Sequence, residues 1–243
     1  MTRVCARWRG LQALVCLLFV LVAARAGARS PEVFEETTDE PGIVAYPPRD
    51  RSAPRPVTVM LHGMCSEPER TCRHFAEVVT ESGWLLCPRA TRRCDGGGSI
   101  WPHQGFDAQI EAGIARVKAR YPGELADEAG RNLIGFSLGA FRALDMAHDG
   151  RRRYPRVILI GARIQPNAER LRAAGVERLL LAAGEWDMMR GHMAGRARAL
   201  SRRGFPAVFQ SLGAVGHAFP ADFPALLRRA LAWTAGQDDA LPT

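Results

Sequence analysis

A serine between two glycines lies where two sequence patterns meet. Residues 131–139 read Arg-Asn-Leu-Ile-Gly-Phe-Ser-Leu-Gly, with an apolar strand-like run before the serine and a helix-like run after it. The segment from Gly135 to Gly139 fits G-x-S-x-G, in which a sharp, strained turn between strand and helix exposes the serine hydroxyl. A Cβ at either glycine would collide with the neighbouring strand or helix. The pattern indicates Ser137 as a nucleophile, and a chance five-residue match is the alternative.

Strand-like and helix-like segments alternate along the rest of the chain. The run at residues 56–61 is rich in apolar residues without alternation, as in a sheet covered on both faces. The strand-like runs cover residues 56–61, 84–87, 133–134, 157–160, 179–183 and 208–212, with a further short one at 42–46. Apolar residues at helical spacing and the intervals between strands predict helices over about residues 68–81, 107–121, 138–148, 168–174, 189–203 and 223–234. The pattern predicts an α/β fold with a mainly parallel, doubly wound sheet flanked by helices.

The first 28 residues have the pattern of a secretory signal peptide. Arg3, Arg7 and Arg9 form a positive start, and Leu11 to Ala24 is an uncharged, mostly apolar run followed by small-residue cleavage sites. This run is short for a permanent membrane-spanning helix. An uncleaved N-terminal anchor is the alternative. The segment predicts a secreted or periplasmic protein without stable membrane insertion after cleavage.

The charge of the remaining chain gives no reason to expect a nucleic-acid partner. Removing residues 1–28 takes away four arginines and no acids, so the formal charge falls from +8 to +4. The run Arg151-Arg152-Arg153 lies where a helix is predicted to end, and cations at that end interact favourably with the helix dipole. No aromatic residues are interleaved with these arginines.

The length and composition predict one folded domain. A chain of 243 residues with 47% hydrophobic residues can bury a substantial single core. Residues 29–55 contain five prolines among polar residues and form a Pro-rich N-terminal segment. We expect the folded domain to cover residues 56–236 and a C-terminal tail to cover residues 237–243.

Four cysteines lie after the predicted signal peptide: Cys65, Cys72, Cys87 and Cys94. An even number in an exported chain predicts two disulfides. Of the three possible pairings we favour the sequence-local one, Cys65–Cys72 with Cys87–Cys94. Both intervals hold six residues rather than the two to four of zinc knuckles, so we expect neither a metal nor another cofactor.

Reactive residue types follow four of the predicted strands. They are His62-Gly63-Met64, Ser137, Asp187 and His217. In a doubly wound sheet, functional residues collect in the loops at the carboxyl ends of strands. A serine nucleophile needs an adjacent base, and the base needs an orienting carboxylate. The chain supplies these in the order serine, acid, histidine.

On these residues the chain resembles the α/β-hydrolases over about residues 56–236, and within them the dienelactone hydrolase and phospholipase/carboxylesterase group. The resemblance implies Ser137 as nucleophile, Asp187 as the acid and His217 as the base. It also implies an oxyanion hole formed by the backbone N–H groups of Met64 and Leu138.

Other residues compete for two of these roles. Glu185 is the alternative acid, although it would still lie in the turn that ends its strand. His103, His148 and His192 are alternative bases, but His217 alone has a Gly-His turn after the final strand. We expect His62 to bind backbone groups and shape the oxyanion loop rather than transfer protons.

The site is predicted to be open. Only about 17 residues separate Gly161 from the strand that begins at Leu179, which leaves no room for a sizeable lid. Trp101, in the loop 88–105, and Trp186, beside the acid, are candidate walls of a substrate pocket.

The predicted function is that of an exported serine hydrolase that cleaves carboxylic esters through an acyl-enzyme, carboxylesterase-like (EC 3.1.1). Its substrate would be a small-molecule or polymer-borne ester, such as a feruloyl or acetyl ester of plant polysaccharide. The alternatives are a non-catalytic binding protein on a hydrolase scaffold and a serine peptidase of the same fold.

Overall fold

The computed structural model describes residues 30–34 and 42–241. The predicted signal peptide lies outside the described residues. Within the part that is described, no helix is long and apolar enough to cross a bilayer.

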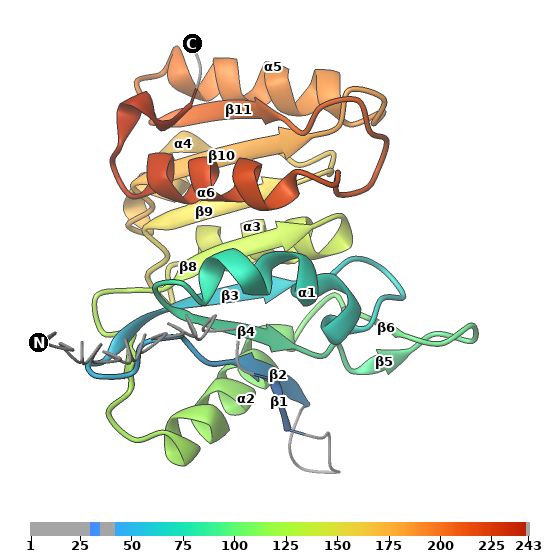
Figure 1. The fold of residues 1–243 in the computed structure, drawn as a ribbon. Helices are drawn as coiled ribbons and strands as arrows, with labels where there is room; N and C mark the ends of the chain where they lie inside the picture. Colours follow the sequence, from blue (N-terminus) through green and yellow to red (C-terminus); the bar gives the residue numbers. More distant parts are fainter. Residues whose placement is uncertain (1–29, 35–41, 242–243) are drawn as a thin grey trace, which may run out of the picture.

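A mainly parallel sheet forms the centre of the molecule (Figure 1), in the strand order β1-β2-β4-β3-β8-β9-β10-β11. In this sheet the β1–β2 and β2–β4 pairs are antiparallel, so β2 runs against the other strands, and β7 pairs in parallel with the start of β3. The strands are β1 (Glu32–Phe34), β2 (Ile43–Tyr46), β3 (Arg55–Leu61), β4 (Trp84–Pro88), β7 (Leu125–Ala126), β8 (Asn132–Phe136), β9 (Arg156–Ile160), β10 (Arg178–Ala183) and β11 (Ala207–Ser211). A separate hairpin joins β5 (Arg92–Arg93) to β6 (Ser99–Ile100).

Helices cover both faces of the sheet, as the sequence pattern predicts. In Figure 1, α1 and α6 lie in front, and the other helices pack on the opposite face. The helices are α1 (Pro68–Val79), α2 (Phe106–Arg120), α3 (Leu138–Asp149), α4 (Ala168–Ala173), α5 (Arg190–Ser201) and α6 (Phe223–Thr234). A short 3₁₀ helix, η1 (Asp238–Ala240), follows α6.

Side-chain alternation explains why the central strands are apolar throughout. In β8, Leu133 faces the core under α2 to α5, and Ile134 faces the core under α1 and α6. Leu159 and Ile160 divide in the same way in β9. Successive side chains of a strand point to opposite faces, so a sheet covered on both sides needs apolar residues at every position.

The register brings the ends of the parallel strands to one edge. Gly135 pairs with Leu61 on one side and with Leu159 on the other, and Ile160 pairs with Ala182. The loops that follow β3, β8, β9 and β10 therefore begin side by side, at the right of the sheet in Figure 1.

The disulfide pairing differs from the prediction. Cys65 bonds to Cys94 and Cys72 bonds to Cys87, with Cα separations of 5.7 and 6.5 Å. Cys72 lies on the buried face of α1, which packs on β4, so the packing of helix on sheet brings it to Cys87. The other bond joins the loop after β3 to the β5–β6 hairpin. Tertiary contact rather than separation along the chain decides which cysteines meet.

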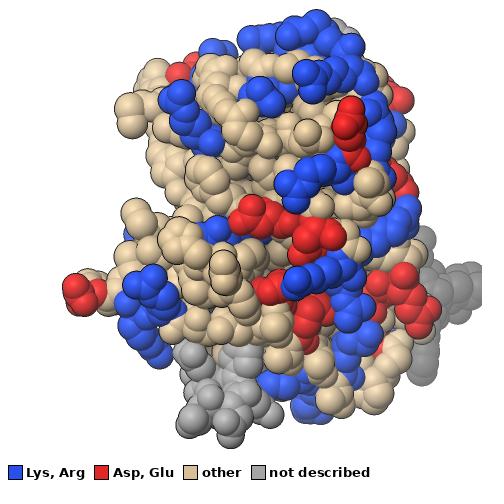
Figure 2. All heavy atoms as spheres, turned by 180° about the vertical axis from the view of Figure 1, so that it is seen from behind, with Lys and Arg blue, Asp and Glu red and all other residues tan. Residues whose placement is uncertain are grey.

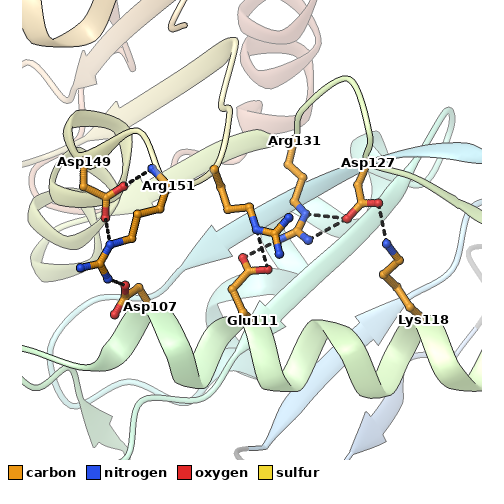
Figure 3. A network of polar contacts seen from close by, with 8 residues as sticks. Asp107, Glu111, Lys118, Asp127, Arg131, Asp149 and Arg151 are labelled. Carbon is orange, nitrogen blue, oxygen red and sulfur yellow. Dashed lines mark hydrogen bonds and ion pairs between the residues drawn. The ribbon is translucent and has the colours of Figure 1, made fainter. Parts of the chain in front are cut away.

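Charged side chains of both signs lie beside one another on the face that carries α2 to α5 (Figure 2). Figure 3 shows the centre of this arrangement, where Arg131 reaches Glu111 on α2 and Asp127 in the segment before β8. The side chains of Arg131 and Asp127 are both only 5% exposed. This network joins α2 to the start of the strand that leads to Ser137.

Candidate active site

Ser137 occupies a strained turn between β8 and α3. Its φ of 56° lies in the left-handed region, which a residue with a side chain rarely adopts. A Cβ on Gly135 would come within 2.6 Å of the backbone of α3, and a Cβ on Gly139 within 2.0 Å of the carbonyl oxygen of Leu61 on β3. The strand and the helix therefore meet so closely that both flanking positions require glycine, as predicted.

Asp187 and His217 form a hydrogen-bonded pair at the same edge of the sheet. His217 Nδ1 lies 2.8 Å from Asp187 Oδ2. The Asp187 side chain is 5% exposed, whereas that of His217 is 44% exposed. With Nδ1–H donated to the carboxylate, the Nε2 atom of His217 carries the lone pair that a general base needs.

The ring of Phe136 connects this pair to the serine. It stacks on the His217 imidazole with centroids 4.9 Å apart and an interplanar angle of 27°. Because Phe136 directly precedes Ser137, this contact holds the imidazole beside the turn that carries the serine.

The competing residues have other partners. Glu185 is exposed, and its backbone N–H donates to Gly213. His192 contacts the carbonyl oxygen of Ile164 at 2.6 Å. His148 accepts a hydrogen bond from the backbone of Asn167, and His103 contacts Arg142.

Gly161 leaves room for the histidine–aspartate pair. A Cβ at this position would lie 2.8 Å from His217 Cε1 and 3.2 Å from Asp187 Oδ2, and the φ of 62° already favours glycine. We expect Gly161→Ala to push the imidazole out of line and to lower ester turnover about 100-fold, the effect of a misplacement of about 1 Å. Steady-state kinetics beside circular dichroism test this. Near-normal turnover in a folded variant would contradict the close packing of this glycine on the pair.

The loop after β3 passes directly against the serine. A Cβ on Gly63 would lie 3.3 Å from the Cβ of Ser137, so Met64, the next residue, lies in a segment that touches the serine turn. Leu138 is the first residue of α3, where a backbone N–H has no partner inside the helix. Both residues therefore belong to segments that adjoin Ser137, and the oxyanion role of their N–H groups stays a prediction.

His62 is a buried structural residue of this loop. Its Nδ1 contacts the carbonyl oxygen of Gly63 at 2.8 Å, and its Nε2 accepts a hydrogen bond from the backbone N–H of Ala90 at 3.2 Å. Burial lowers the pKa of His62 to about 4. The ring is therefore neutral at pH 7 with its proton on Nδ1, and it binds backbone groups as the sequence predicts.

The neutral state of His62 makes stability depend on pH. The unfolded chain binds a proton at this histidine below its ordinary pKa of about 6.5, whereas the folded protein binds one only near 4. Stability is therefore full above pH 6.5 and is lost as the pH falls towards 4, by about 2 kcal/mol between pH 7 and pH 5. Urea unfolding at both pH values measures this difference. We expect it to shrink by about that amount in His62→Gln, and an equal difference in both proteins would contradict the assignment.

Trp101 does not form an open pocket wall, which corrects the prediction. Its side chain is 2% exposed, and the indole N–H donates to the carbonyl oxygen of His62 at 2.8 Å. The ring packs under the loop after β3, and a carbonyl group of that loop supplies the acceptor that a buried indole N–H needs. Trp186, in contrast, is 72% exposed beside Asp187 and stays a candidate for substrate contact.

Comparisons with solved structures identify the fold. The fluorophosphonate-binding serine hydrolase F of Staphylococcus aureus, solved with bound substrate, is similar over 86% of this chain and 100% of its own, with a TM-score of 0.65 and 15% identity. A ferulic acid esterase is similar over 84% and 96%, with a TM-score of 0.63 and 14% identity. The chain has the α/β-hydrolase fold.

Other α/β-hydrolase structures are similar in the same way. An acyl-protein thioesterase 2 from Zea mays has a TM-score of 0.56 and 19% identity, covering 80% of this chain and 99% of its own. No protein-family model and no curated protein matches the sequence. The predicted fold class is confirmed, and no large separate lid domain is evident among residues 30–34 and 42–241.

Two further residues contribute to the candidate site. Gly161 borders the histidine–aspartate pair, and Phe136 stacks on the histidine. A glycine directly after a buried strand was the available signal for the first, whereas no pattern marks the second. Among the described residues, no group of three or more His, Cys, Asp or Glu side chains is arranged to hold a metal ion.

Proposed function

We propose that this chain is an exported serine hydrolase that cleaves carboxylic esters through an acyl-enzyme. The proposal rests on a strained Ser137 at the sheet edge that also carries the 2.8 Å pair of His217 and Asp187, with His217 stacked on the residue before the serine. The serine hydrolases and esterases among the similar structures agree with it.

In the first half of the reaction, the Oγ atom of Ser137 attacks the ester carbonyl carbon and His217 Nε2 takes the hydroxyl proton. Asp187 accepts the Nδ1–H bond and stabilises the imidazolium that forms. The N–H groups of Met64 and Leu138 donate to the oxyanion of the tetrahedral intermediate. Collapse of the tetrahedral intermediate expels the alcohol, which receives the proton from His217. The acyl group stays bound to Ser137.

In the second half, water replaces the alcohol. His217 takes a proton from the water, whose oxygen attacks the acyl carbon, and the proton returns to Ser137 as the carboxylic acid leaves. The buried carboxylate of Asp187 supports the charged imidazole in both halves, because a charge is stabilised more strongly where water is excluded.

The two disulfides support the proposed export. Disulfides form and persist in oxidising compartments outside the cytosol. They agree with the predicted signal peptide and with a secreted or periplasmic destination.

Labelling and turnover of residues 29–243 test the function together. We expect a fluorophosphonate probe to attach covalently, with the labelled peptide containing Ser137, and p-nitrophenyl esters to be hydrolysed. Labelling at another serine would remove the proposed nucleophile. A folded protein that is neither labelled nor active on any ester would overturn the esterase proposal.

A further inference from the structure

Exposed hydrophobic side chains gather around the candidate active site. Among the described residues, five large hydrophobic side chains are exposed, and four of them lie on segments that follow β3, β8 and β10, at the sheet edge that carries the candidate site. We call these four the apolar rim: Met64, Phe141, Trp186 and Met188. Exposed hydrophobic residues that are scattered singly need no explanation, whereas a cluster marks a binding surface.

The fold places the apolar rim on both sides of Ser137. Met64 follows β3, Phe141 lies one turn along α3 from the serine, and Trp186 and Met188 flank Asp187 after β10. In the sheet, β8 lies between β3 on one side and β9 and β10 on the other. Neighbouring strands are about 4.8 Å apart, so the rim spans a distance that an extended substrate can cover.

The two most exposed rim residues stand on an anchored turn. The backbone N–H of Trp186 donates to Val215, in the loop that carries His217, and the N–H of Arg190 donates to the carbonyl oxygen of Asp187. Asp187 Oδ1 also accepts a hydrogen bond from the backbone of Met189. The turn is fixed at both ends while Met188 is 90% exposed, so its hydrophobic side chain is held in water by a fixed backbone.

We propose that the apolar rim binds the apolar part of the substrate, so that the preferred esters carry a long-chain or aromatic group rather than a small acyl group on a sugar. The inference rests on the proposed esterase function. The side chains of Met64, Phe141 and Met188 offer no strong hydrogen-bonding group for sugar hydroxyls. Covering them with a hydrophobic group removes apolar surface from water, which favours binding.

The acyl and alcohol sides are tested separately by matched pairs of esters. The acyl pair is p-nitrophenyl octanoate and acetate, and the alcohol pair is octyl acetate and methyl acetate, whose leaving alcohols have similar intrinsic reactivity. In the wild type we expect kcat/KM to favour the larger ester at least about 10-fold in one pair or both. In the double variant Trp186→Ser/Met188→Ser we expect that preference to fall about 10-fold. A fall in the acyl pair assigns the rim to the acyl chain, and a fall in the alcohol pair assigns it to the alcohol.

A matched control separates the effect of the apolar rim on ester preference from the effect of removing any exposed hydrophobic side chain. Val33 is the other exposed large hydrophobic residue among those described and lies on β1, far along the sheet from the site. We expect Val33→Ser to leave both preferences unchanged. Equal preferences in the wild type and in the Trp186→Ser/Met188→Ser variant would overturn the inference.

Binding without hydrolysis gives a second, independent measurement. In Ser137→Ala, ligand-observed NMR compares octyl acetate with methyl acetate, with and without the two rim substitutions. We expect the octyl ester to bind more tightly only where the rim is intact, and equal binding would also overturn the inference. Hydrolysis that needs Ser137 but shows no rim effect would leave the esterase proposal standing. If the wild-type protein showed neither labelling nor hydrolysis, the esterase proposal itself would be removed.

Discussion

In Ser137→Ala, ester turnover falls about 10⁴-fold or more if the serine is the nucleophile. Without its Oγ atom no acyl-enzyme forms, and the remaining groups can only bind the ester and stabilise its oxyanion. The substituted alanine must adopt the same left-handed φ, but the change removes no buried contact that holds the fold. We therefore expect the variant to fold, and the measurement is kcat/KM for p-nitrophenyl esters together with fluorophosphonate labelling.

Ser201→Ala is the matched control for this loss. Ser201 is an exposed serine at the end of α5, away from the carboxyl ends of β3 and β8. We expect this variant to keep wild-type turnover and labelling. If Ser137→Ala retained a tenth or more of the activity, another group would be the nucleophile.

Replacing Arg131 by alanine is expected to lower the free energy of unfolding by about 3–5 kcal/mol, since it breaks a buried ionic network. Arg131 donates to Glu111 at 2.6 Å and to Asp127 at 2.7 and 3.0 Å (Figure 3). Burial alone would raise the pKa of Asp127, but hydrogen bonds from Lys118 and Arg131 hold that pKa below its usual value. Without Arg131, a largely buried carboxylate loses two of its hydrogen bonds, and Lys118 is the cation that remains to neutralise it.

Urea unfolding of Arg131→Ala beside Arg152→Ala measures this effect. Arg152 contacts the same Glu111 at 3.2 Å, but its side chain is 59% exposed. Exposed ion pairs contribute about 0–1 kcal/mol, so the control is expected to lose little stability. If both variants lost the same amount, burial would not be what makes the Arg131 network important.

Replacing Asp127 together with Arg131 tests whether the loss of stability comes from the unpaired buried charge. When both partners of a buried ion pair are replaced by apolar residues, the cost is far smaller than when one charge is left alone. Arg131→Met/Asp127→Leu should therefore be more stable than Arg131→Ala, despite carrying more substitutions. A lower stability of the double variant would indicate that Arg131 acts through packing rather than through charge.

Local sequence patterns were sufficient to predict the central strands and the turn that carries Ser137. The apolar runs before Gly135 and Gly161 predicted central strands within one or two residues, because a strand covered on both faces must be apolar at every position. The glycines around Ser137 predicted the turn, since the required backbone geometry is local. The short strands β1, β5, β6 and β7 were missed, because a strand of two or three residues is too short to show a periodic pattern and is defined only by its pairing.

The sequence by itself determined the α/β architecture, the serine turn and the order in which the serine, acid and histidine follow their strands, because those features depend on periodicity and on local steric demands. Only the tertiary structure decided that Cys65 meets Cys94, that Trp101 is buried under His62 and that Phe136 stacks on His217. Each of these contacts joins segments that are far apart in the chain. Their distance and orientation follow from how helices pack on the sheet, which no local pattern encodes.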